Sequence, residues 1–236
     1  MANGNFIVSG CSYSVGSSSV TEARKNPTTW NHLLLKKYNP AIFANLSIPG
    51  AGNIAITSNL ILFLENNKHI VPDHTAIILN LTELDRMDLP CAVDHPNANR
   101  FFSWADSLNC NWLTEGAFTV NKSPFNQALQ KNIGYDQIVM FSCLSVLKCF
   151  GYLESRGFDY RFMLMLDSVY TESPQWFQEA LDQRIKKWIQ IREYRGMQDY
   201  GRANKLLHTD NYHLSLDGNQ HIANVIDDTE YLKGFL

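Results

Sequence analysis

Three residues whose side chains can together activate a hydroxyl group lie far apart in the sequence. Ser12 stands in GCSYSVGSSS, directly after the apolar run FIVS, and Asp210 and His213 stand in DNYH near the C-terminus. A serine becomes a strong nucleophile when a histidine accepts its proton and a carboxylate orients that histidine. Asp210 and His213 are three residues apart, so one tight turn can point both side chains the same way. We therefore expect Ser12 as nucleophile, His213 as base and Asp210 as orienting acid.

The loop around Ser12 also has to be tested against other chemistries. A P-loop would need a lysine, but Gly10 and Gly16 are followed by Ser17. A cysteine phosphatase would need an arginine six residues after Cys11, and that position is again Ser17. We interpret Cys11 as a small buried residue. Two alternatives stay open, a plain capping turn and a flavodoxin-like phosphate or nucleotide site built from Ser12, Ser14, Ser17 and Ser18.

Apolar runs alternate with amphipathic stretches along the chain. The strand candidates are 5–10, 41–48, 75–81 and 160–166. The helix candidates are 28–38, 53–67, 136–156 and a final helix after DNYH. This alternation predicts an α/β fold, a three-layer α/β/α sandwich with a central parallel sheet. Ligands of such sheets bind beyond the carboxyl ends of the strands, where the Ser12 loop would lie.

Two stretches depart from the alternation. Residues 86–135 contain Pro90, Pro96 and Pro124, and we expect an irregular insertion of short helices or loops there, within one domain spanning 1–236. Residues 173–195 have helical spacing of apolar side chains, which predicts an amphipathic helix whose tryptophans serve core or lid packing.

Composition excludes several function classes. The 236 residues carry 20 basic and 23 acidic side chains without long runs, so neither a nucleic-acid surface nor a membrane surface is expected. The N-terminus does not resemble a signal peptide, and no apolar stretch reaches the roughly 20 residues of a membrane span. The five cysteines lack metal-ligand spacing, which indicates reduced thiols, no metal and a cytoplasmic protein.

Three segments, SGCSYSVG, NLSIPGAGN and DNYHLSLDGNQHIA, resemble the conserved blocks of the SGNH (GDSL-type) hydrolases, in a branch with G-C-S in place of G-D-S. The resemblance implies the flavodoxin-like fold of that superfamily and a Ser12, His213 and Asp210 triad without a cofactor. It further implies that the backbone N–H groups of Ser12 and Gly50 form the oxyanion hole. Gly52 is the reserve for Gly50, and Asp217 is the reserve for Asp210.

One block departs from the family pattern. After the third strand the family carries an asparagine that donates to the oxyanion, and this chain has Leu84 at that place, which cannot donate. Asn80, Thr82 or a residue of the insertion are the candidate substitutes. We expect the neighbouring Glu83, Asp85 and Arg86 to form an ion-paired turn at the rim of the site.

The resemblance implies an esterase that cleaves O-acyl groups from a carbohydrate or a small lipid-like molecule. The alternative from another class is a binding module that keeps the fold after its oxyanion hole has decayed, and Leu84 is its main support. We read His208 and His221 as supporting or surface residues near the DNYH segment. The sequence leaves the substrate and the oligomeric state open.

Overall fold

A parallel sheet forms the centre of the computed structural model. The structure describes residues 4–14, 28–91, 111–117, 127, 132–210 and 212–236, with the backbone alone for 89–91 and 111–117. The sheet has the strand order β2-β1-β3-β6. Its strands are β1 (Asn5–Ser9), β2 (Ile42–Asn45), β3 (Thr75–Leu81) and β6 (Tyr160–Leu164). All three pairings are parallel, so the carboxyl ends of the strands share one edge.

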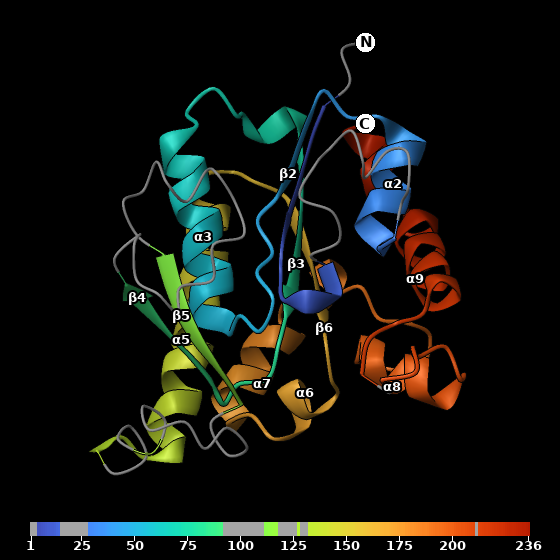
Figure 1. Cartoon of the computed structure of the whole chain (residues 1–236). Coiled ribbons are helices and arrows are strands. Elements are labelled where there is room, and N and C mark those ends of the chain that lie inside the picture. The colour runs from blue at the N-terminus through green and yellow to red at the C-terminus, as the bar shows by residue number, and fades with distance from the viewer. Residues whose placement is uncertain (1–3, 15–27, 92–110, 118–126, 128–131, 211) are drawn as a thin grey trace.

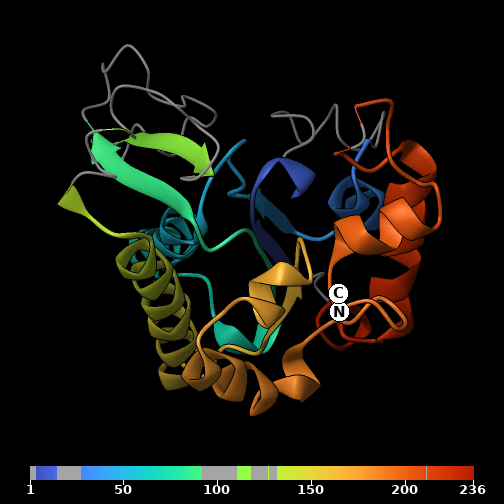
Figure 2. The same ribbon diagram turned by 90° about the horizontal axis from the view of Figure 1, so that it is seen from below.

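Helices cover both faces of this sheet (Figure 1). The longer helices are α2 (Trp30–Tyr38), α3 (Asn53–Asn66), α5 (Tyr135–Ser155) and α9 (Leu216–Asp228). Helices α3 and α5 pack together on one face, and α2 and α9 pack together on the other (Figure 2). All seven residues of β3 are buried, as a strand covered on both faces requires. The predicted three-layer α/β/α architecture is confirmed.

Shorter helices connect these elements at the edges of the sheet. The α-helices are α6 (Ser168–Thr171), α7 (Gln175–Asp182) and α8 (Met197–Ala203). The 3-10 turns are η1 (Ser12–Ser14), η2 (Pro72–His74), η4 (Ile185–Lys187) and η5 (Leu232–Gly234). Of these, η1 and α8 carry residues of the site described below.

The insertion differs from its prediction. Strands β4 (Arg86–Cys91) and β5 (Asn111–Ala117) form a two-stranded antiparallel ribbon instead of short helices or loops alone. The pairing joins segments far apart in the sequence, which local patterns do not reveal. Pro90 argued against a strand, but a two-stranded ribbon consists of edge strands, where proline is tolerated. Residues 92–110 and most of 118–131 lie outside the described residues.

The predicted helix over 173–195 is also wrong beyond its first half. Helix α7 ends at Asp182, and the chain then extends so that the backbone N–H of Ile189 donates to the carbonyl of Phe162 at 2.8 Å. Trp188 forms a parallel bridge with Phe162 and stacks on its ring. Pairing with the exposed edge of β6 therefore overrides the helical spacing in this segment.

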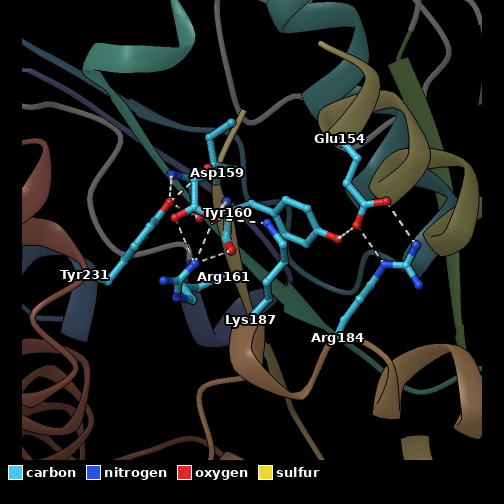
Figure 3. Close-up of polar contacts among 8 residues, drawn as sticks. Glu154, Asp159, Tyr160, Arg161, Arg184, Lys187 and Tyr231 are labelled. Atoms are coloured by element: carbon cyan, nitrogen blue, oxygen red, sulfur yellow. Dashed lines mark hydrogen bonds and ion pairs between the residues drawn. The ribbon is translucent and has the colours of Figure 1, made fainter. Parts of the chain in front are cut away.

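A polar network stabilises the amino end of β6, opposite the site (Figure 3). Glu154 of α5 accepts hydrogen bonds from Tyr160 at 2.8 Å and from the Arg184 guanidinium at 2.9 and 3.0 Å. Asp159 pairs with Arg161 at 2.9 Å and with a lysine of η4 at 3.0 Å. The network ties α5, β6 and η4 together, and each of its cations is paired with one of its two carboxylates.

Helix α5 is, in the described part of the chain, the one helix long and apolar enough to cross a membrane by length and composition. Buried residues along it include Ile138, Val146 and Phe150, and it packs against α3. A helix of the protein core meets the same criterion, so this finding carries no argument for a membrane span.

Candidate active site

Ser12 lies in η1, directly after the central strand β1. The turn from β1 into η1 requires a glycine at position 10. A Cβ there would lie 2.9 Å from the Cβ of Asn80 and 3.0 Å from the Oγ of Ser14. Three asparagines then fix Ser14. The Asn31 and Asn45 side chains each donate to its carbonyl at 2.7 Å, and Asn80 donates to its hydroxyl at 3.2 Å. Ser12 is therefore presented at the carboxyl edge of the sheet on a turn with little freedom.

His213 and Asp210 lie in a loop that closes on itself before α9. The backbone N–H of His208 donates to the carbonyl of His213 at 2.7 Å, and Leu207 forms an antiparallel bridge with Leu214. Helix α9 begins directly afterwards, where the Ser215 side chain accepts from the N–H of Gly218. The loop is thus held between a short bridge and a capped helix.

The three predicted side chains are brought together. His213 Nε2 lies 3.1 Å from Ser12 Oγ, and His213 Nδ1 lies 2.7 Å from Asp210 Oδ2. The second carboxylate oxygen of Asp210 accepts from the backbone N–H groups of Tyr212 and His213 at 2.8 and 2.9 Å. The hydrogen bond from His213, followed by these two backbone bonds, holds the pKa of Asp210 well below its usual range. An ionised Asp210 can therefore orient the imidazole while Nε2 faces the serine.

Tyr13, which sequence analysis did not single out, links the two loops. Its hydroxyl donates to the carbonyl of Tyr212, and its ring lies 5.5 Å from the ring of His213 between centroids. The Gln198 amide of α8 also approaches that carbonyl, at 3.3 Å. The position of Tyr13 next to Ser12 was the only signal in the sequence, and it gave no indication of the distant partner.

Gly50 lies in a tight turn that runs beside the Ser12 loop. The N–H of Ala51 donates to the carbonyl of Ile48 at 3.1 Å, and the φ of Gly50 is +73°, as in a type II turn with Pro49 before the glycine. The N–H of Ile48 donates to the carbonyl of Gly10 at 3.0 Å, which places the turn alongside η1. Among the described residues, neither the N–H of Ser12 nor that of Gly50 has a hydrogen-bond partner.

The other candidate donors have partners elsewhere. The N–H of Gly52, the reserve for Gly50, donates to Asp88 Oδ1 at 2.8 Å. The Asn80 amide donates to Ser14, and Thr82 donates through its N–H to Asn53 Oδ1 at 2.9 Å and through its hydroxyl to the Met165 sulfur at 3.5 Å. Asn80 and Thr82 are fully buried and do not line the cavity at Ser12. We therefore do not carry them forward as oxyanion donors.

A cavity of about 640 Å³ opens beside Ser12 and His213. The residues that line it mix apolar surface with polar and charged groups: Ser12, Tyr13, Glu83, Arg86, Met165, Leu166, Gln198, Arg202, Tyr212 and His213. Gly50 is half-buried and is not among them. The expected ion pair at the rim is present, since Arg86 Nε lies 2.6 Å from a carboxylate oxygen of Glu83.

The remaining candidates lie apart from this chain of hydrogen bonds. Cys11 is fully buried, and its thiol approaches the Met165 sulfur at 3.6 Å. His221 bonds to the Tyr200 hydroxyl at 2.9 Å, and Asp217 is exposed in the first turn of α9. Of the serines proposed for a phosphate site, Ser14 is buried against Asn80, while Ser17 and Ser18 lie outside the described residues. The described residues contain no group of three or more histidine, cysteine or acidic side chains that could hold a metal ion.

Comparison with known proteins identifies the fold. No family model matches the sequence, and no curated protein matches it either. A catalytic mutant of Axe2, an acetylxylan esterase from Geobacillus stearothermophilus, matches with a TM-score of 0.51 at 10% identity, over 97% of this chain and 94% of that chain. The psychrotrophic esterase EstA from a Pseudoalteromonas species matches with a TM-score of 0.50 at 14% identity, over 96% of each chain. A G-D-S-L family lipolytic protein from Veillonella parvula matches with a TM-score of 0.50 at 10% identity, over 95% and 96% of the two chains.

The chain has the SGNH (GDSL-type) hydrolase fold. At 10–14% identity these comparisons establish the architecture and not the chemistry. Within the SGNH fold, the Ser12 loop follows the first strand, and the loop with Asp210 and His213 precedes the last long helix.

Proposed function

We propose that this protein is a serine esterase that cleaves an O-acyl ester through an acyl-enzyme. One observation carries the proposal: the continuous chain of hydrogen bonds from Asp210 through His213 to Ser12, at 2.7 and 3.1 Å. The uncommitted N–H groups of Ser12 and Gly50, on adjacent loops, provide further support.

The reaction follows from this geometry. Ser12 Oγ attacks the ester carbonyl carbon while His213 Nε2 takes the hydroxyl proton, and Asp210 stabilises the resulting imidazolium. The negative charge moves to the carbonyl oxygen, where the N–H groups of Ser12 and Gly50 donate to it. His213 then gives its proton to the leaving alkoxide. A water molecule activated by His213 releases the acyl group by the same steps in reverse order.

The substrate we propose is the ester of a carbohydrate or of a small lipid-like alcohol. The cavity combines the apolar surfaces of Met165 and Leu166 with the polar groups of Gln198 and Arg202, which suits a short acyl chain beside a hydroxyl-rich alcohol. The acetylxylan esterase and the lipolytic protein with the same fold act in these two substrate classes. We infer a small-molecule substrate met in the cytoplasm.

The test is hydrolysis of p-nitrophenyl acetate and longer acyl esters by the wild type, Ser12→Ala and His213→Ala. The matched control is His208→Ala, because His208 lies in the same loop and its backbone bond to His213 survives the substitution. We expect turnover by the wild type and the control, and loss of at least about 10³-fold in the two triad variants. A fluorophosphonate should also label Ser12 in the wild type, as read by peptide mass spectrometry.

A binding module is the second candidate, and Leu84 favours it. Leu84 is buried in the hydrophobic core and offers no donor to the cavity. If the folded wild type turns over no ester and is not labelled at Ser12, the esterase proposal is contradicted and this second one is supported.

A further inference from the structure

A second feature of the cavity is a mostly buried cation that lines it together with Ser12. Arg86 lines the same cavity as Ser12 and His213, and its side chain is only 16% exposed. Its Nε is committed to the Glu83 carboxylate at 2.6 Å. The two terminal nitrogens make no hydrogen bond to any residue that the structure describes. A guanidinium carries five N–H donors in a fixed plane, so most of this group's donors are available to a ligand in the cavity.

The backbone of Arg86 is fixed against the turn that carries Gly50. A Cβ at Gly52 would lie 2.7 Å from the carbonyl oxygen of Arg86 and 2.9 Å from its Cβ, so only glycine permits this approach. Two residues further along β4, Asp88 accepts hydrogen bonds from the N–H groups of Gly52 and Ala55 at 2.8 and 2.9 Å. The start of β4 and the Gly50 turn are therefore one rigid unit.

Two segments, the Ser12 loop and the start of β4, line the cavity, and the Ile48–Gly50 turn lies against both of them. The Ile48–Gly50 turn runs beside the Ser12 loop through the bond from Ile48 to Gly10, and Arg86 packs on the end of that turn. An ester carbonyl placed for attack by Ser12 would develop its negative charge among these segments. Two backbone N–H groups are available there, and no side chain at the end of β3 in the described region adds a third, since Leu84 is apolar and Thr82 is committed elsewhere.

We propose that Arg86 is the third donor of the oxyanion hole. The inference rests on the proposed esterase function and deepens it. In the transition state the carbonyl π electrons move to the oxygen, and a terminal N–H of the guanidinium donates to that oxygen without proton transfer. Hydrogen bonds from a charged donor are about twice as strong as neutral ones. Glu83 orients the guanidinium and balances its charge before the substrate arrives.

The test compares Arg86→Met and Arg86→Lys with wild type on an uncharged p-nitrophenyl ester. Loss of one oxyanion donor typically lowers kcat by about 10²–10³-fold. We expect that loss for Arg86→Met with KM changed by less than about threefold, and a smaller loss for Arg86→Lys, which keeps the charge without the planar fork. Arg156→Met is the control, because Arg156 is also ion-paired, with Glu65 at 3.4 Å, but does not line the cavity.

Two further measurements separate catalysis from structure. Guanidinium ion at millimolar concentrations should restore part of the kcat of Arg86→Ala and leave Ser12→Ala inactive. Inhibition by a boronic acid, whose tetrahedral adduct carries a negative charge, should weaken in Arg86→Met by a factor similar to the loss in kcat/KM. Circular dichroism and urea unfolding of each variant establish that it is folded.

The outcomes are distinguishable. If folded Arg86→Met keeps the wild-type kcat while Ser12→Ala is inactive, the assignment of Arg86 is overturned and the esterase proposal stands. If the substitution raises KM for anionic esters alone, Arg86 binds a substrate carboxylate instead, and the assignment is again overturned. If the wild type neither turns over esters nor labels at Ser12, the proposed function fails, and this inference fails with it.

Discussion

At the scale of single residues, one backbone carbonyl in the site is held by two side chains that take no part in the proposed reaction. Tyr13 and Gln198 both donate to the carbonyl of Tyr212, the residue before the proposed base. Burial raises the pKa of Tyr13, so its hydroxyl stays protonated and able to donate at any pH at which an esterase is assayed. Tyr13, the residue after Ser12, therefore ties the loop of the proposed nucleophile to the loop of the proposed base.

Removing this contact should lower the reaction rate more than substrate affinity. We expect Tyr13→Phe to reduce kcat by about 10- to 100-fold with little change in KM, because a small misplacement of a catalytic group can cost about 10²-fold. The rate of fluorophosphonate labelling at Ser12 should fall by a similar factor. The control is Tyr38→Phe, which removes a hydrogen bond from the hydroxyl of Tyr38 on α2 to Asp227 on α9. Wild-type kcat in Tyr13→Phe would show that the tether does not position His213.

At the scale of elements, sequence patterns located the strands and helices that present the proposed triad. The runs at 5–10 and 75–81 became β1 and β3 within a residue, and the run at 53–67 became α3. These segments are uniform in period and end at clear turn residues, so local propensity and burial agree. The run at 41–48 became a shorter strand, because β2 ends at Asn45, whose side chain turns back to bond to Ser14 and Ser47.

The rest of the site could not be read from local patterns, because it depends on long-range contacts. The position of Arg86 follows from its packing against Gly52 and from the bonds of Asp88 across 33 and 36 positions of sequence. The end of α7 at Asp182 follows from pairing of the next segment with β6. The D-x-x-H spacing identified Asp210 and His213 because that contact is local.

Helix α2 contains a buried histidine that should make stability depend on pH. His32 is fully buried, and within the described structure neither ring nitrogen has a hydrogen-bond partner. Burial lowers its pKa from 6.5 to about 4. The folded state therefore binds fewer protons than the unfolded state between these values, and stability falls as pH falls through that window.

The size of this effect can be measured by urea unfolding at pH 7.5 and pH 5. We expect His32 alone to remove about 2 kcal/mol from the free energy of unfolding between the two conditions. His32→Leu should abolish that part of the difference, because leucine does not titrate. An equal pH difference in wild type and variant would show that His32 is protonated in the folded protein.

At the scale of the whole molecule, the three cysteines whose side chains the structure describes are sealed in the core. Cys11, Cys143 and Cys149 are fully buried, and burial raises the pKa of Cys143 and Cys149 to about 12. Thiolates are the reactive form, so Cys143 and Cys149 are protected by their raised pKa as well as by burial, and Cys11 is protected by burial.

Alkylation of the native protein should therefore leave these three thiols unmodified. Labelling with a maleimide, followed by peptide mapping, should modify them only as fast as the molecule opens, and rapidly in urea. Rapid native labelling of Cys143 or Cys149 would show that α5 separates from the sheet under native conditions. The comparison is made peptide by peptide, so the other two cysteines do not affect it.

Ser12 and His213 are 201 positions apart in the sequence and meet at one hydrogen bond. The DNYH loop is held by a short bridge and a few polar contacts, whereas β1 lies at the centre of the buried sheet. Segments held by few buried contacts open at a lower free energy than the core. Mild heat or dilute urea should therefore abolish the proposed ester hydrolysis while the circular dichroism spectrum is still that of the native protein. Turnover by the proposed esterase then reports whether the DNYH loop is docked, more sensitively than any measure of average helix content.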